Sequence, residues 1–134
     1  MASVLKVDTI TGVTTAGSIS VTGEGGSTTT NLQQGLAKAW VNFQGSSTAA
    51  IRDALNSSSL TDNGSGDYTN TYTSAFANTN YSSPTSSKQS DTYNDRYLSI
   101  KAASTTTTRS YHYNYSINYH DADYAHIAIF GDLA

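Results

Sequence analysis

The sequence predicts an all-β protein, an antiparallel β-sandwich-like domain preceded by an extended N-terminal arm. Twenty threonines and ten tyrosines supply side chains that favour strands. Short stretches of alternating apolar and polar residues recur between clusters of Ser, Asn, Thr and Gly, as in short strands joined by turns. Five glycines fall within residues 12–26, where apolar residues are few. We therefore assign residues 1–35 to the arm and residues 36–134 to the β-domain.

The composition predicts a folded chain with a thin core. Leu, Ile, Val and Phe make up 22 of the 134 residues, a share low enough for disorder to be considered. Disorder also needs a high net charge and few aromatic residues, whereas this chain has a net charge of -3 and ten tyrosines. Because assembly raises the surface that each residue buries, we expect the chain to oligomerise.

The composition also argues against several classes of function. The chain has no cysteine, so it can form neither a disulfide framework nor a thiolate metal site. Its seven Lys and Arg residues are scattered and the net charge is negative, which argues against nucleic-acid binding. No apolar run is long enough to span a membrane, and no signal peptide is visible. We expect a soluble protein made in a cytoplasm, without membrane insertion.

The arm contains two stretches with strand character. Residues 3–11 are rich in β-branched side chains and predict a strand, and residues 18–22 predict a second one. Residues 12–30 are either a flexible linker or an arm that orders against another chain. The apolar residues that we expect to make assembly contacts are Val4, Leu5, Val7 and Ile10.

The β-domain begins near the densest apolar cluster in the first half of the chain. Residues 31–39 can form one or two helical turns, with Asn31 as the N-cap. The cluster follows at once, and its three members are expected to anchor the core. They are Trp40, Val41 and Phe43.

The next two segments also predict strands. Residues 49–56 have helical propensities, but their side chains alternate, so we favour a strand over a helix. Residues 59–69 alternate on both sides of a turn at residues 63–66. Glycines in that turn permit positive φ at low cost, which predicts a tight hairpin.

The middle of the chain predicts two further strands, at residues 68–76 and 93–102. Residues 77–92 between them contain the single proline and predict a loop. The large side chains expected to point inward are Tyr68, Tyr72, Phe76, Tyr93 and Tyr97, together with Leu98 or Ile100.

The clearest two-residue alternation lies at residues 111–119. Four tyrosines and Ile117 share one face, while His, Asn and Ser side chains share the other. Residues 120–123 predict a turn and residues 124–130 an apolar strand, so we expect the last two strands to form a hairpin.

The four tyrosines of this stretch are the candidate binding residues. They are Tyr111, Tyr113, Tyr115 and Tyr119. If exposed, they can stack on sugar rings, with neighbouring His and Asn side chains as polar partners. Alternatively, they pack a trimer axis or the core between two sheets, in place of the scarce aliphatic side chains.

Metal binding and catalysis have weaker support. His120 and His126 flank a turn with Asp121 and Asp123 and could converge on an ion, but surface histidines beside a turn give the same pattern. No Gly-x-Ser-x-Gly elbow is present, and nothing distinguishes the aspartates from solvated loop acids. We therefore expect no metal, no cofactor and no enzymatic activity.

Several sequence blocks resemble proteins of bacteriophage particles. The opening block Ser3-Val-Leu-Lys-Val-Asp-Thr-Ile10 resembles the start of tail-fibre and related virion proteins from marine bacteriophages, including phages of cyanobacteria and Pelagibacter-like hosts. A domain that recurs in those proteins is similar to Gly35-Leu-Ala-Lys-Ala-Trp-Val-Asn-Phe43, Ala50-Ile-Arg-Asp53, Ser58-Ser-Leu-Thr-Asp-Asn-Gly-Ser-Gly-Asp-Tyr-Thr69 and Asn78-Thr-Asn-Tyr81.

The resemblance implies a homotrimeric, non-enzymatic virion component of the short tail-fibre type, made in the host bacterial cytoplasm. Residues 1–35 would be an attachment or trimerisation arm that contacts other virion proteins. Residues 36–134 would be a trimeric β-sandwich knob that contacts the host surface. Two alternatives stay open: a capsid decoration or head-fibre protein, and a glycan-binding, lectin-like module for host surface polysaccharide.

Overall fold

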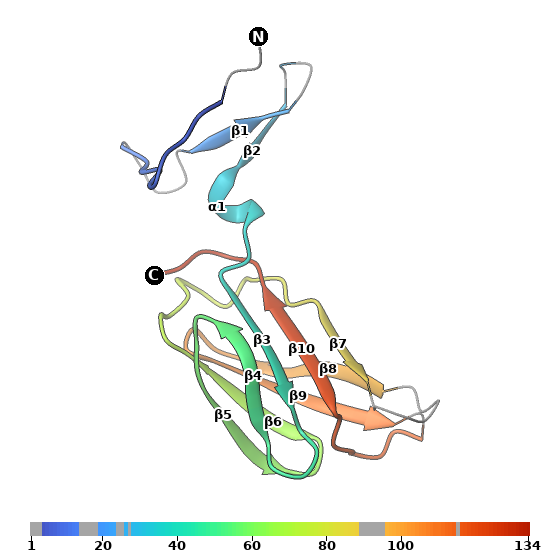
Figure 1. Cartoon of the computed structure of the whole chain (residues 1–134). Helices are drawn as coiled ribbons and strands as arrows, with labels where there is room; N and C mark the ends of the chain where they lie inside the picture. The colour runs from blue at the N-terminus through green and yellow to red at the C-terminus, as the bar shows by residue number, and fades with distance from the viewer. Residues whose placement is uncertain (1–3, 14–18, 24–25, 27, 89–95, 115) are drawn as a thin grey trace. The chain divides into compact units, whose positions relative to one another are not determined.

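The computed structural model describes residues 4–13, 19–23, 26, 28–88, 96–114 and 116–134. In these residues the secondary structure consists of ten strands and one short helix. The chain divides into two compact units, which we call the N-terminal unit (residues 1–36) and the sandwich unit (residues 37–134). Figure 1 labels the strands of both units.

The N-terminal unit contains one strand pair and one helical turn. Strand β1 (Ser20–Thr22) pairs antiparallel with β2 (Thr29–Asn31), and α1 (Leu32–Gly35) follows. The Asn31 side chain accepts a hydrogen bond from the Gln34 amide at 3.1 Å. This contact confirms the predicted helical turn and its N-cap.

One of the two predicted strands of this unit is confirmed, as β1, and the other is wrong. Residues 4–11 form no strand. β-branched side chains favour an extended backbone, but a strand also needs a neighbouring strand to exchange hydrogen bonds with. The described part of this unit offers residues 4–11 no such partner.

The sandwich unit consists of two four-stranded antiparallel sheets packed face to face (Figure 1). The strand order is β4-β3-β10-β7 in the first, the β3 sheet, and β5-β6-β9-β8 in the second, the β9 sheet. The bounds are β3 (Ala39–Gln44), β4 (Ala50–Leu55), β5 (Ser57–Gly64), β6 (Asp67–Tyr72), β7 (Thr85–Lys88), β8 (Arg96–Ala103), β9 (Thr107–Asn114) and β10 (Tyr124–Ile129). The predicted all-β sandwich is confirmed.

The core lies between the sheets and is formed by alternate residues of the central strands. Val41 and Phe43 are 2% and 0% exposed, as predicted for core residues. Phe43 packs against Tyr68, with 5.4 Å between the ring centroids. The prediction is wrong for Trp40, which is only partly buried. Neighbouring residues of a strand point to opposite faces, so Trp40 lies on the outer face of β3.

The predictions for β4 and for the following hairpin are confirmed. β4 is a strand rather than a helix, and a bulge opposite Asn42 and Phe43 takes Arg52 out of the simple alternation. β5 and β6 form the predicted hairpin. Gly66 in its turn has φ 65°, and a Cβ there would lie 2.7 Å from the His112 carbonyl oxygen, so this position requires glycine.

Residues 77–92 were expected to form a loop, and this expectation is wrong because they contain β7. This strand pairs antiparallel with β10 at the edge of the β3 sheet. Its side chains are small or polar, so hydrophobic periodicity gives no sign of it. Pro84 precedes the strand, and its carbonyl oxygen accepts a hydrogen bond from the Ala128 amide at 3.0 Å.

The predicted hairpin of the last two strands is also wrong. β9 has both edges occupied, by β6 and β8, so β10 cannot pair with it. Instead, β10 lies in the β3 sheet between β3 and β7. The predicted strand at residues 111–119 ends at Asn114, and the chain passes from one sheet to the other between residues 114 and 124.

The alternation in β9 places polar side chains, rather than tyrosines, in the core. The inward residues Thr108, Ser110 and His112 are at most 1% exposed. The tyrosines of β9 lie on the opposite face, so the alternative in which they fill the core between the sheets is wrong. The His112 ring packs against aromatic rings of β3 and β6.

The same register corrects one prediction for β8. Tyr97 lies opposite Tyr113 and is 58% exposed, so it does not point inward as predicted. Leu98 and Ile100 do pack against the core, as predicted. The predicted inward Tyr93 lies outside the described residues.

Candidate functional site

Both outward faces of the sandwich unit carry aromatic side chains. On the β9 sheet these residues are Tyr97, Tyr111, Tyr113 and Tyr119, which we call the tyrosine face. On the β3 sheet, Trp40 lies in a surface depression that we call the Trp40 groove. The tyrosine face contains predicted binding residues, whereas the groove is not predicted by the sequence analysis.

Three of the four candidate tyrosines lie together. Tyr113 and Tyr119 stack, with ring centroids 5.1 Å apart and 29° between the ring planes. Tyr111 meets both rings edge-on, at 6.0 Å from Tyr113 and 4.9 Å from Tyr119. Tyr115, the fourth, lies outside the described residues.

A tight return of the chain brings Tyr119 back onto this face. The Asn114 side chain accepts hydrogen bonds from the Ser116 and Asn118 amides, both at 3.0 Å. The Asn114 amide in turn donates to the Asn118 carbonyl, also at 3.0 Å. Ile117 has φ 61°, which is rare for a β-branched residue. Asn114 therefore closes a turn at the point where the alternation predicted a continuing strand.

Charged groups already use part of the tyrosine face. The Lys101 ammonium donates to the Tyr111 hydroxyl and lies 4.3 Å from the centroid of the Tyr111 ring. Arg109 forms a bidentate pair with Asp67, through Nε to Oδ1 at 2.7 Å and Nη2 to Oδ2 at 2.5 Å. The hydrogen bonds from Arg109 hold the pKa of Asp67 below its usual value. The rings and charged groups of this face therefore already contact one another.

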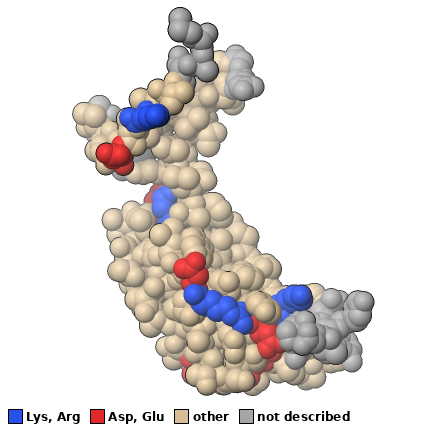
Figure 2. All heavy atoms as spheres, viewed as in Figure 1, with Lys and Arg blue, Asp and Glu red and all other residues tan. Residues whose placement is uncertain are grey.

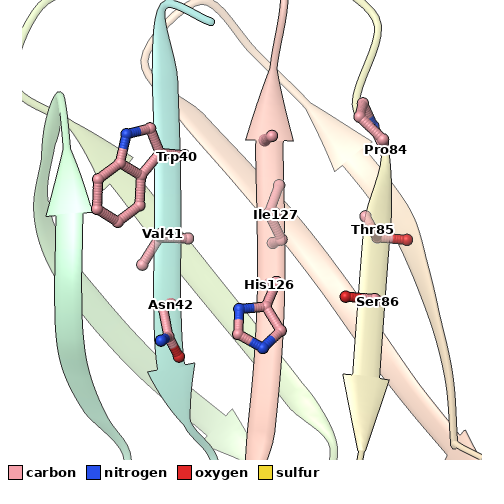
Figure 3. Close-up of a pocket in the computed structure, with 9 residues that line it drawn as sticks. Trp40, Val41, Asn42, Pro84, Thr85, Ser86, His126 and Ile127 are labelled. Atoms are coloured by element: carbon pink, nitrogen blue, oxygen red, sulfur yellow. The ribbon is translucent and has the colours of Figure 1, made fainter.

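The Trp40 groove is an open depression of about 430 Å³ on the outer face of the β3 sheet (Figure 3). This volume is in the range of small-molecule sites. Figure 3 shows the Trp40 and His126 side chains on the neighbouring strands β3 and β10. The lining residues are Trp40, Val41, Asn42, Pro84, Thr85, Ser86, His126, Ile127 and Ala128.

Strand register arranges the outward side chains of this sheet in two parallel rows. The apolar row consists of Leu55, Trp40, Ala128 and Pro84. The polar row consists of Asp53, Asn42, His126 and Ser86. Side chains directly opposite each other on antiparallel strands have Cβ atoms about 5 Å apart. An aromatic surface thus lies beside a continuous line of hydrogen-bonding groups.

The Trp40 ring and the Asn42 side-chain oxygen have few partners within the fold. Within the part of the chain that the structure describes, Trp40 makes no ring–ring contact, cation–π contact or side-chain hydrogen bond. The Asn42 Oδ1 atom is buried without a hydrogen-bond partner in the same residues. A buried acceptor without a partner is uncommon and costs free energy, so it calls for an explanation.

Charges border the groove but do not enter it. The Arg52 guanidinium lies 4.2 Å from the centroid of the Tyr124 ring and donates to Gln44 Oε1 at 2.8 Å. None of the nine lining residues is Lys, Arg, Asp or Glu. Figure 2 shows the charged side chains of the sandwich unit mainly in one narrow band, with most of the visible surface uncharged.

The structure separates His120 and His126, the two histidines considered for metal binding, and places the third histidine elsewhere. His112 is buried in the core, His126 lines the Trp40 groove, and His120 is exposed. The Asp121 carboxylate accepts a hydrogen bond from the Tyr68 hydroxyl at 2.5 Å. Over the described residues, no three His, Asp or Glu side chains lie close enough together to hold a metal ion.

His112 occupies an aromatic site in the core. Its ring meets Phe43 and Tyr68 edge-on, with centroids at 5.6 and 5.3 Å. Neither ring nitrogen has a hydrogen-bond partner among the described residues. Burial lowers the pKa of His112 to about 4, although the Asp121 charge opposes this shift. The imidazole is therefore neutral at pH 7 and fills space in the core.

The Trp40 groove has a partial signal in the sequence. In β3, Ala39, Val41 and Phe43 alternate with Trp40 and Asn42. Since Val41 and Phe43 share the inward face, the period of two already places Trp40 and Asn42 together on the other. His126 and Ser86 join them only through the pairing of β10 with β3 and β7, which periodicity does not specify.

Comparison with known proteins identifies no relative: no family model, no curated protein and no solved structure matches this chain. No helix within the described ranges is long and apolar enough to cross a membrane.

Proposed function

We propose that this chain is a bacteriophage virion structural protein of the short tail-fibre type, a homotrimer anchored by its N-terminal arm. The observation that carries the proposal is the exposure of the four apolar residues expected to make assembly contacts. Val4, Leu5, Val7 and Ile10 are 74, 81, 52 and 58% exposed. They lie in the block that resembles the start of marine phage fibre proteins.

The described residues of the N-terminal unit form no core of their own. None of its described residues is buried, and β1 and β2 are three residues long each. An isolated pair of short strands is at best marginally stable in water. Exposed apolar side chains gain stability when another surface covers them. Sister chains and other virion proteins are the partners that a fibre-type protein offers.

The sandwich unit differs from the arm because it has a closed core between two sheets. A unit with its own core suits a projecting knob that meets the host surface. The second candidate function, a lectin-like module for host surface polysaccharide, is favoured by the aromatic side chains on both outward faces.

Incorporation into particles tests the proposal. Phage particles are assembled with either the full-length chain or a chain lacking residues 1–35 in place of the natural copy. We expect an immunoblot of purified particles to detect the full-length chain and not the truncated one, because the arm carries the exposed apolar residues expected to dock. Equal incorporation of the two chains would contradict an anchoring arm, and absence of both would contradict the virion assignment.

A further inference from the structure

We infer that the Trp40 groove binds a neutral saccharide, with Trp40 as the stacking surface and Asn42 and His126 as hydrogen-bonding groups. The inference rests on the proposed function and deepens it, because it gives the sandwich unit a ligand class and a location for binding. Three features of the groove support this ligand class: the aromatic surface, the polar row beside it and the uncharged lining.

The first requirement of such a site is an aromatic ring with a free face. A pyranose ring presents an apolar face of C–H groups that packs flat on an aromatic side chain, and tryptophan offers the largest such surface. Trp40 is held on β3 beside Ala128, a small residue that leaves room above the sheet. Its indole has no ring or cation partner within the described residues.

The second requirement is a set of donors and acceptors for sugar hydroxyls. Asn42 and His126 are cross-strand neighbours on β3 and β10, and His126 lies opposite Ser86 on β7. An amide, an imidazole and a hydroxyl can each form hydrogen bonds with sugar hydroxyls.

The charge of the groove selects the kind of saccharide. Its lining carries no Lys or Arg that could pair with a carboxylate or sulfate of an acidic sugar. The Asp53 carboxylate at the end of the polar row would repel such a group. Because the groove is open, a neutral sugar can enter it as part of a longer chain.

The tyrosine face meets these requirements less well. Tyr113 and Tyr119 already stack on each other, and Lys101 lies over the ring of Tyr111. Tyr111 is also only 9% exposed. A sugar would have to displace these contacts, whereas the Trp40 ring has no ring or cation partner among the described residues.

Trp40 is the only tryptophan of the chain, so its fluorescence reports directly on the groove. The full-length protein is titrated with methyl glycosides of glucose, galactose, mannose and N-acetylglucosamine and with their short oligosaccharides. Methyl glucuronide serves as the acidic probe. We expect a saturable change in tryptophan emission with at least one neutral probe, and none with the acidic one.

Matched variants on the two faces locate the binding. By calorimetry with the neutral probe, Trp40→Ala and Asn42→Ala should each weaken binding about tenfold or more, as expected for loss of a stacking surface or of a hydrogen bond. Tyr113→Ala, the control on the tyrosine face, should bind as the unchanged protein does. Trp40 and Asn42 lie outside the core, so thermal unfolding should show that all three variants fold.

Three results would overturn the inference. They are no saturable response over the whole panel, binding that survives Trp40→Ala but is lost in Tyr113→Ala, and a lower native mass of Trp40→Ala, which would place a sister chain in the groove. If the saccharide inference is wrong, the full-length chain is still incorporated into particles. If the virion assignment is wrong, the full-length chain is absent from particles.

Discussion

The ring of His112 fills a position between Phe43 and Tyr68 that a purely apolar pattern would give to an aliphatic or phenyl group. The ring is 0% exposed, and both of its nitrogens lack partners among the described residues. Burial away from water disfavours the charged form, so protonation of His112 favours the unfolded chain.

We predict that His112 makes the protein sensitive to mild acid. Its pKa is about 4 in the folded chain, against 6.5 for an ordinary histidine. The unfolded chain therefore binds more protons between these values. The stability contribution is present above pH 6.5 and is lost as the pH falls toward 4. Urea unfolding at pH 7 and pH 5 should show a loss of about 2 kcal/mol from this group.

His112→Phe is the matched control for that loss. Phenylalanine keeps an aromatic ring beside Phe43 and Tyr68 and has no group to protonate. The difference in unfolding free energy between pH 7 and pH 5 should therefore shrink by about 2 kcal/mol in this variant. Identical pH dependence in the two proteins would show that the histidine is not responsible.

Residue positions in β3 were predictable only in part. The apolar cluster correctly identifies Val41 and Phe43 as core residues. Trp40 was grouped with them because it is large and apolar, but residue size does not override the two-residue period of a strand. In β9 the tyrosines looked like the buried face for the same reason, while Ser110 and His112 take that place.

At the scale of elements, the turn between β5 and β6 depends on Gly66. Gly66 has a φ of 65°. A Cβ atom at this position would lie 2.7 Å from the His112 oxygen and from the His120 nitrogen, so the turn packs closely against β9 and the following segment. We predict that Gly66→Ala lowers the free energy of unfolding by about 2 kcal/mol or more, measured by urea denaturation.

Gly66→Asn separates the two causes of this loss. Asparagine tolerates positive φ better than alanine but carries the same Cβ atom. Since the close approach involves backbone atoms, we expect Gly66→Asn to be about as destabilising as Gly66→Ala. Recovery of stability with asparagine would mean that backbone conformation alone requires the glycine.

Elements with local signals were predictable, and elements defined by distant partners were not. Helix α1 has its cap in sequence, and the β5–β6 hairpin has its turn glycines, so both predictions hold. β7 has no apolar pattern and exists because β10 pairs with it. The C-terminal hairpin failed for a related reason, since β6 and β8 already flank β9. The groove depends on the same long-range pairing.

At the scale of the whole molecule, the two units differ in how they are stabilised. The sandwich unit has a core drawn from both sheets, whereas the described part of the N-terminal unit has no buried residue. Residues 1–36 hold 9 of the 22 Leu, Ile, Val and Phe residues of the chain, but none of those that the structure describes there is buried. Covering the apolar side chains there is the physical reason to expect assembly through the arm.

The native mass of the full-length protein, from light scattering coupled to size exclusion, tests this account most directly. Residues 37–134 are measured beside it. We predict a mass near three times the 14.2 kDa chain for the full-length protein. A trimeric mass for residues 37–134 as well would place contacts between chains in the sandwich unit, and a lower mass would place them in the N-terminal unit. A single-chain mass for the full-length protein would contradict the homotrimer.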